Sequence, residues 1–184
     1  MTRLVLLLLA LLLPAMAGPA KPDDAAYKAF AQKVKLDPDE LERVKKLSPK
    51  FFDMLSNRDN WAKWAKTIHE RIGIFTSCEV QLILLDEPQR NFFARGGFGD
   101  KEGSFIKINL AAVPKELASS FEEHCVHELT HVMHYTIGPG GDTSNWFREG
   151  LACYAAGQHG RIARLREIVL ITDRMDYVAA ATSN

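Results

Sequence analysis

Apolar residues recur with a helical period through the first third of the chain. One stripe consists of Tyr27, Phe30, Ala31 and Val34, and a second consists of Trp61, Trp64, Ile68 and Ile72. Two start signals lie between the stripes, Asp37-Pro38 and Ser48-Pro49. A capping side chain followed by Pro is typical of the first turn of a helix. The pattern therefore predicts helices from Pro22 to Gly73, where the glycine ends the second stripe.

The pattern changes to that of strands after Gly73. Residues 80–85 form a continuous apolar run, which predicts a strand buried on both faces. Residues 94–100 are rich in Gly and predict a loop. Residues 104–110 alternate, with Ile106, Ile108 and Leu110 on one side and Phe105, Lys107 and Asn109 on the other. This alternation predicts a strand with one buried face, and its polar residues indicate an exposed edge of the sheet.

Three further helices are predicted in the second half of the chain. The first runs from about Pro114 to Tyr135 and ends at the glycines of residues 138–141. The second begins near Asp142–Ser144 and carries Trp146 to Ala156, and the third lies near Ile162 to Leu170. Helices before and after a short run of strands indicate an α+β fold with a small mixed sheet.

The amino end has the pattern of a secretory signal peptide. Arg3 precedes an apolar run from Leu4 to Leu13, and the small residues Ala15 and Ala17 follow Pro14. Cleavage near Ala17 would leave a secreted or periplasmic protein without a stable membrane span. An uncleaved anchor is the alternative, although the run is short for the ~20 residues that span a bilayer.

Composition and charge indicate one ordinary globular protein. The 184 residues include 23 Lys+Arg and 23 Asp+Glu, so the formal net charge is zero. Such a balance argues against nucleic acid as a partner. The hydrophobic share of 47% excludes wholesale disorder. The three cysteines, Cys78, Cys125 and Cys153, are too few for a disulfide scaffold, and whether two of them pair stays open.

The chemistry of the chain centres on an H-E-x-x-H motif on the helix predicted around residues 114–135. The motif consists of His127, Glu128 and His131. Residues four apart project from one face of a helix, so the two imidazoles can hold one Zn²⁺. Glu128 lies beside the first His and can take a proton from a water molecule activated by the metal. The motif predicts a hydrolytic zinc site.

A third protein ligand must come from another element. Asp142 falls in the Gly-rich turn, where a helix cap is the simpler role. Glu149 lies on the next predicted helix, 18 positions after His131. An antiparallel helix after a short connection can return this carboxylate to the two His. We expect the adjacent Gly150 to let the two helices approach closely.

These motifs resemble those of the gluzincins, the zinc peptidases whose third ligand is a Glu. The sequence HELTH, followed by WFREGLA at residues 146–152, is most similar to the peptidase MA-like domain group. The resemblance covers about residues 61–156 and implies His127, His131 and Glu149 as zinc ligands, with Glu128 as general base. It also implies that the edge strand at residues 104–110 pairs with substrate backbone. On this basis we expect an N-terminal helical segment at 18–58 and a peptidase domain at 59–184.

Several positions depart from the family pattern. No glutamate stands in the Gly-rich stretch where aminopeptidase relatives grip a substrate amino terminus, so aminopeptidase activity is not supported. The group that stabilises the oxyanion in gluzincins is a Tyr or His further along the chain, and only Tyr154, His159 and Tyr177 remain as candidates. Cys153 replaces the acid that usually orients a zinc ligand. We expect His124 and His134, which extend the row of motif histidines, to be polar residues along the cleft.

The sequence thus predicts an exported zinc metallopeptidase with a peptide or protein substrate. A catalytically weak or inactive zinc protein that binds peptides is the alternative. A purely structural zinc site is a third hypothesis, and it would need a fourth protein ligand. Substrate preference, endo- or exopeptidase action and oligomeric state stay open.

Overall fold

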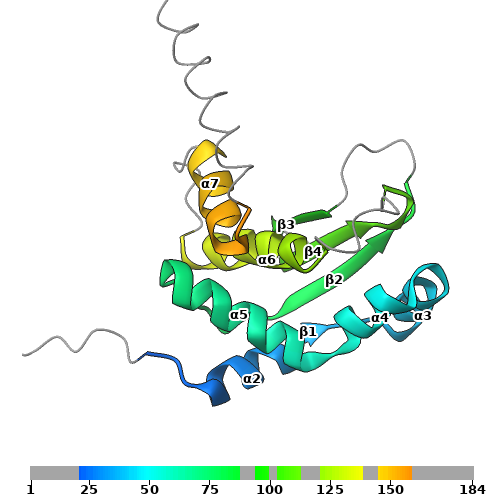
Figure 1. Cartoon of the computed structure of the whole chain (residues 1–184), viewed down its shortest axis with the longest axis horizontal. Coiled ribbons are helices and arrows are strands. Elements are labelled where there is room, and N and C mark those ends of the chain that lie inside the picture. Colours follow the sequence, from blue (N-terminus) through cyan, green and yellow to red (C-terminus); the bar gives the residue numbers. More distant parts are fainter. Residues whose placement is uncertain (1–20, 88–93, 100–102, 113–120, 139–144, 159–184) are drawn as a thin grey trace, which may run out of the picture.

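The computed structural model describes residues 21–87, 94–99, 103–112, 121–138 and 145–158 (Figure 1). The predicted signal peptide and the helix predicted near residues 162–170 lie outside these ranges. Within them the protein combines α-helices with one four-stranded mixed sheet, so the prediction of an α+β fold is confirmed. No helix in the described ranges is both long and apolar enough to cross a membrane.

Four helices occupy the N-terminal part, as the sequence predicts. They are α2 (Asp24–Gln32), α3 (Pro38–Leu47), α4 (Pro49–Ser56) and α5 (Arg58–Ile72). Both predicted start signals are confirmed, because the side chains of Asp37 and Ser48 accept hydrogen bonds from backbone N–H groups in the first turns of α3 and α4. Val34 does not continue the first helix, since it lies in the short strand β1 (Val34–Lys35).

The sheet has the order β1-β2-β4-β3. The strands β2 (Val80–Leu85) and β4 (Gly103–Asn109) form the centre, and β3 (Ala94–Gly99) is the outer strand on one side. β2 runs parallel to both β1 and β4, while β3 runs antiparallel to β4. The four strands therefore form a mixed sheet whose antiparallel strand lies at an edge.

The prediction of an edge strand at residues 104–110 is wrong. β4 is paired on both sides, with β2 and with β3. The segment predicted as a Gly-rich loop forms the edge strand instead. Glycine is unfavourable in a strand and often marks a place where another backbone approaches closely. Gly96 of β3 is such a place, because an added Cβ atom there would clash with the backbone of Glu128, as described below.

Two predictions of strand burial are also wrong. β2 is not buried on both faces, because Gln81 is exposed and Ile83 and Leu85 are only partly buried. Asn109 is fully buried rather than exposed on a polar face. Its side chain accepts a hydrogen bond from the Glu87 N–H at 3.0 Å and donates one to the Glu87 carbonyl oxygen at 2.9 Å, so the buried amide is satisfied.

Two helices carry the HELTH and WFREGLA motifs. They are α6 (Phe121–Ile137) and α7 (Asn145–Ala156), and a short 3-10 helix, η1 (Leu110–Ala112), follows β4. α6 lies against β3 and β4, and α7 stands across one end of α6 (Figure 1). The start of α7 agrees with the prediction, and the part of the first predicted helix before residue 121 lies outside the described ranges.

One hydrophobic cluster joins these elements. It extends from Tyr27 in α2 to Ala156 in α7 and includes the fully buried Trp61 and Trp64 of α5. The indole N–H of Trp64 donates a hydrogen bond to Glu122 at 3.1 Å, which ties α5 to α6. The predicted apolar stripe of α5 is confirmed as core. The motif helix α6 is therefore held by packing on the sheet and on α5.

Candidate metal centre

The two histidines of the motif project from the buried side of α6. His127 is 2% exposed and His131 is 8% exposed. Their Nε2 atoms lie 3.2 Å apart, and their rings are nearly perpendicular, at 78°. Because the residues are four positions apart, the helix itself brings the two imidazoles together. This part of the site agrees with the sequence prediction.

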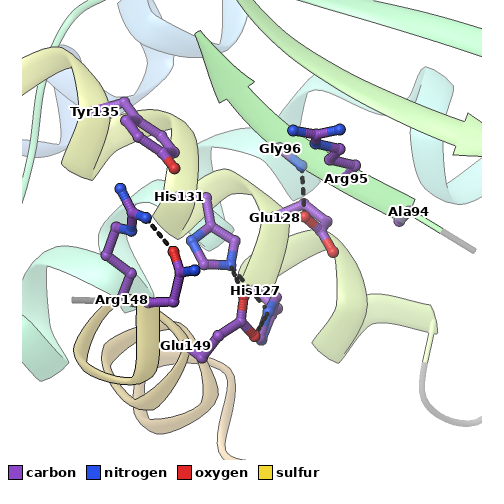
Figure 2. A pocket seen from close by; sticks show the side chains of 10 residues that line it. Ala94, Arg95, Gly96, His127, Glu128, His131, Tyr135, Arg148 and Glu149 are labelled. Atoms are coloured by element: carbon purple, nitrogen blue, oxygen red, sulfur yellow. Dashed lines mark hydrogen bonds and ion pairs between the residues drawn. The ribbon is translucent and has the colours of Figure 1, made fainter. Parts of the chain in front are cut away.

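Glu149 approaches the two histidines from α7. Its Oε2 lies 3.4 Å from His127 Nε2, and its Oε1 lies 3.3 Å from His131 Nε2. Hydrogen bonding with His127 and then with His131 holds the pKa of Glu149 well below its usual range, against the opposing effect of burial. The carboxylate therefore stays ionised, which is the form that binds a cation. Figure 2 shows it directed at the two imidazoles.

These atoms are close enough together to hold one small cation. Ligand atoms on all three residues lie within 4.8 Å of one another. Ligands at about 2.0–2.1 Å from zinc in a tetrahedron are ~3.3 Å apart. The two Nε2 atoms are 3.2 Å apart, and each lies 3.3–3.4 Å from a different oxygen of Glu149. Two imidazoles and one carboxylate are also a donor set that zinc accepts. The described residues thus bring together a candidate metal centre of three ligands.

Glu128 is held beside this centre by the edge strand β3. The N–H of Gly96 donates a hydrogen bond to Glu128 Oε2 at 2.5 Å. Figure 2 shows one carboxylate oxygen at Gly96 and the other turned away from it. The hydrogen bond fixes the orientation of the carboxylate and leaves the second oxygen free to accept a proton.

The approach of β3 to α6 requires a glycine at position 96. A Cβ atom at this position would clash with the carbonyl oxygen of Glu128 and would lie 2.8 Å from its carbonyl carbon. Both are backbone atoms of the motif helix, so neither can move without shifting the helix. The spacing between the edge strand and the helix that carries the motif is therefore set at Gly96.

We expect Gly96→Ala to lower the free energy of unfolding by about 1–3 kcal/mol, the usual cost of overpacking. Gly97→Ala is the matched control, because a Cβ there would lie 3.4 Å from the tip of the Phe105 ring and can be accommodated with little shift. Urea unfolding of both variants measures the difference. Equal stability of Gly96→Ala and the parent protein would show that β3 does not lie this close to α6.

The candidate metal centre opens into a pocket of about 470 Å³. Besides the motif residues, its lining includes Tyr135, Asn145 and Arg148. None of these three had a predicted role in the site. Tyr135 follows His131 by four positions, so helical spacing alone could have placed it on the same face. The positions of Asn145 and Arg148 depend on how α7 is rotated against α6, which the sequence does not specify.

Other predicted residues are not brought into the site. Tyr154 is 52% exposed and does not line the pocket. His124 and His134 do not line it either, although both lie on α6 and are partly buried. Asp142, His159 and Tyr177 lie outside the described residues.

Two small residues of α7, Gly150 and Cys153, lie in surroundings that the sequence does not predict. Nothing lies within 4 Å of a Cβ placed on Gly150, so the prediction that this glycine allows close helix packing is wrong. Cys153 is fully buried, with its sulfur 3.8 Å from His127 Nδ1, on the side of the ring away from Glu149. Cys153, Cys78 and Cys125 are all free thiols, so no disulfide joins them.

Comparison of the chain with protein-family models, with curated proteins and with solved structures gave no match. The interpretation of the site therefore depends on its geometry and on the two motifs in the sequence.

Proposed function

We propose that the protein is a zinc metallopeptidase. The observation that carries the proposal is the convergence of His127, His131 and Glu149, whose ligand atoms lie within 4.8 Å of one another, with Glu128 in the same pocket. When bound there, zinc would polarise the scissile carbonyl and acidify a water molecule. A structural zinc site is less well supported, because the group that the described residues form contains three ligands rather than four.

Glu128 has the role of general base in this proposal. Its free carboxylate oxygen takes a proton from the attacking water and returns it to the leaving amine. The hydrogen bond from Gly96 keeps the carboxylate in place between these two transfers. A protein that only binds peptides gains nothing from such a base, and this favours the enzyme over the binding module.

The strand proposed to dock the substrate is β3 rather than β4. Gly96 directs its N–H to Glu128 and hence away from β4, so the backbone groups of Ala94 and Phe98 also point away from β4 by strand alternation. An extended peptide can add to such an edge through main-chain hydrogen bonds. Ala94 also lines the pocket, which places this edge next to the metal centre.

Tyr135 is our candidate for the donor to the oxyanion, in place of Tyr154 or His159. Its hydroxyl is directed into the pocket, across the histidine pair from Glu128 (Figure 2). A donor on that side can stabilise the carbonyl oxygen while Glu128 acts on the water.

Tyr135→Phe should lower kcat by about 10²–10³, the usual cost of one oxyanion donor, with zinc content unchanged. Tyr154→Phe is the matched control, because this Tyr is exposed and outside the pocket. Steady-state rates on a peptide substrate distinguish the two. A large loss in Tyr154→Phe with none in Tyr135→Phe would reverse the assignment.

The proposed function itself is tested by removing and restoring the metal. We expect the purified protein to cleave peptides in a mixed library, to lose this activity with a chelator and to regain it with about one equivalent of Zn²⁺. Mass spectrometry of the products also separates internal cleavage from removal of terminal residues. Zinc binding without any cleavage across the library would favour the peptide-binding module instead.

A further inference from the structure

Arg148 lies in the pocket of the candidate metal centre but is not one of its ligands. It is on the first turn of α7, directly before Glu149, and its side chain is half-buried. The guanidinium donates a hydrogen bond to Asn145 Oδ1 and lies over the Tyr135 ring, 5.2 Å from the ring centroid. Two neutral groups thus fix its position at the pocket wall.

No carboxylate among the described residues pairs with Arg148. The carboxylate nearest to it in sequence, that of Glu149, is directed to the two histidines. A guanidinium has five N–H donors, and Asn145 occupies only one side of it. Arg148 is thus a half-buried, oriented cation in a pocket, and no described residue other than Asn145 accepts a hydrogen bond from it. Such a guanidinium is suited to bind a carboxylate through two parallel hydrogen bonds.

The position of Arg148 indicates where such a carboxylate would lie. Figure 2 shows Arg148 and Tyr135 on one side of His131, with Glu128 and the β3 strand on the other. A peptide bond held over the metal centre would therefore have Glu128 on one flank and Arg148 on the opposite flank. A carboxylate close in sequence to that bond could reach the guanidinium.

We propose that Arg148 is a specificity residue that binds a carboxylate of the peptide substrate, within a pocket wall formed with Asn145 and Tyr135. The carboxylate is either the C-terminal carboxyl group or the side chain of an Asp or Glu near the cleaved bond. This inference rests on the proposed peptidase function, since it names the substrate class of the same site.

The test is equilibrium binding of three matched probes to the full chain carrying Glu128→Gln, which prevents turnover. The probes are an N-acetylated alanine-rich hexapeptide with a free C-terminal carboxylate, the same peptide as its C-terminal amide, and an amide peptide with one central Asp. We expect the free acid or the Asp peptide to bind at least about tenfold more tightly than the plain amide, as for a hydrogen bond to a charged group. Preference for the free acid indicates carboxypeptidase specificity, and preference for the Asp peptide indicates a side-chain subsite.

Adding Arg148→Gln should make the affinities of the three peptides equal. Asn145→Ala provides a second variant, expected to weaken the same preference by loosening the guanidinium. Arg43→Gln is the control, because this exposed Arg lies on α3, away from the pocket. Equal affinity for all three peptides, no binding of any peptide, or a preference that survives Arg148→Gln would overturn the proposal.

Zinc content and binding to zinc-free protein separate this proposal from the peptidase function. If the protein binds no zinc but shows a carboxylate preference that depends on Arg148, the subsite is supported and the peptidase function is contradicted. Zinc-dependent cleavage with no carboxylate preference would support the peptidase function and contradict the subsite.

Discussion

Protein carrying Glu128→Gln will keep its zinc and lose about 10²–10⁴ of its hydrolytic rate, the usual contribution of a general base. Glu128 is not among the three converging ligands, so an amide in its place leaves the candidate metal centre intact. Gln is close in shape and can still accept the Gly96 N–H through its amide oxygen. What it loses is the ability to take a proton from water.

Initial rates on a cleaved peptide, with zinc measured by mass spectrometry on the same samples, test this expectation. Glu123→Gln is the matched control, because Glu123 is an exposed residue of the same helix and does not line the pocket. If Glu128→Gln loses its zinc, Glu128 acts as a ligand. If its rate equals that of the parent, Glu128 has no part in the chemistry.

Each of the three substitutions His127→Ala, His131→Ala and Glu149→Ala is expected to weaken zinc binding by at least about a hundredfold. Removal of a partner that merely orients a ligand already costs 10–100-fold, and a ligand itself contributes more. The Glu149 variant also leaves the close His127–His131 pair without the carboxylate that lies 3.3–3.4 Å from both rings.

Competition with a chromophoric chelator measures these affinities. His134→Ala is the control, since His134 is on the same helix and belongs neither to the ligand group nor to the pocket lining. Undiminished zinc affinity in Glu149→Ala would show that Glu149 is not the third ligand of the H-E-x-x-H motif.

The sequence predicts the helices and the pairing of His127 with His131 because both depend on local spacing. The caps at Asp37 and Ser48 act within one helical turn, and His127 and His131 meet through the geometry of a single helix. The prediction of Glu149 depended on the second motif, WFREGLA, and the structure places its carboxylate close to the two histidines.

What the sequence does not predict depends on contacts between distant segments. The Gly-rich residues of β3 have little tendency to form a strand, and their pairing with β4 and their close approach to Glu128 are tertiary effects. Mistaking β3 for a loop also made β4 look like an edge. The place of Arg148 in the pocket likewise depends on how α7 packs against α6, which the sequence does not specify.

The proposed peptidase function depends on one zinc ion held by three protein ligands, with a fourth position left for water. Zinc-edge X-ray absorption on full-length protein loaded with one equivalent of Zn²⁺ measures that coordination directly. We expect four nitrogen and oxygen neighbours at about 2.0–2.1 Å, of which two are imidazoles, and no sulfur. A sulfur neighbour at about 2.3 Å, coordination by four protein groups without water, or failure to retain zinc would contradict the proposed centre.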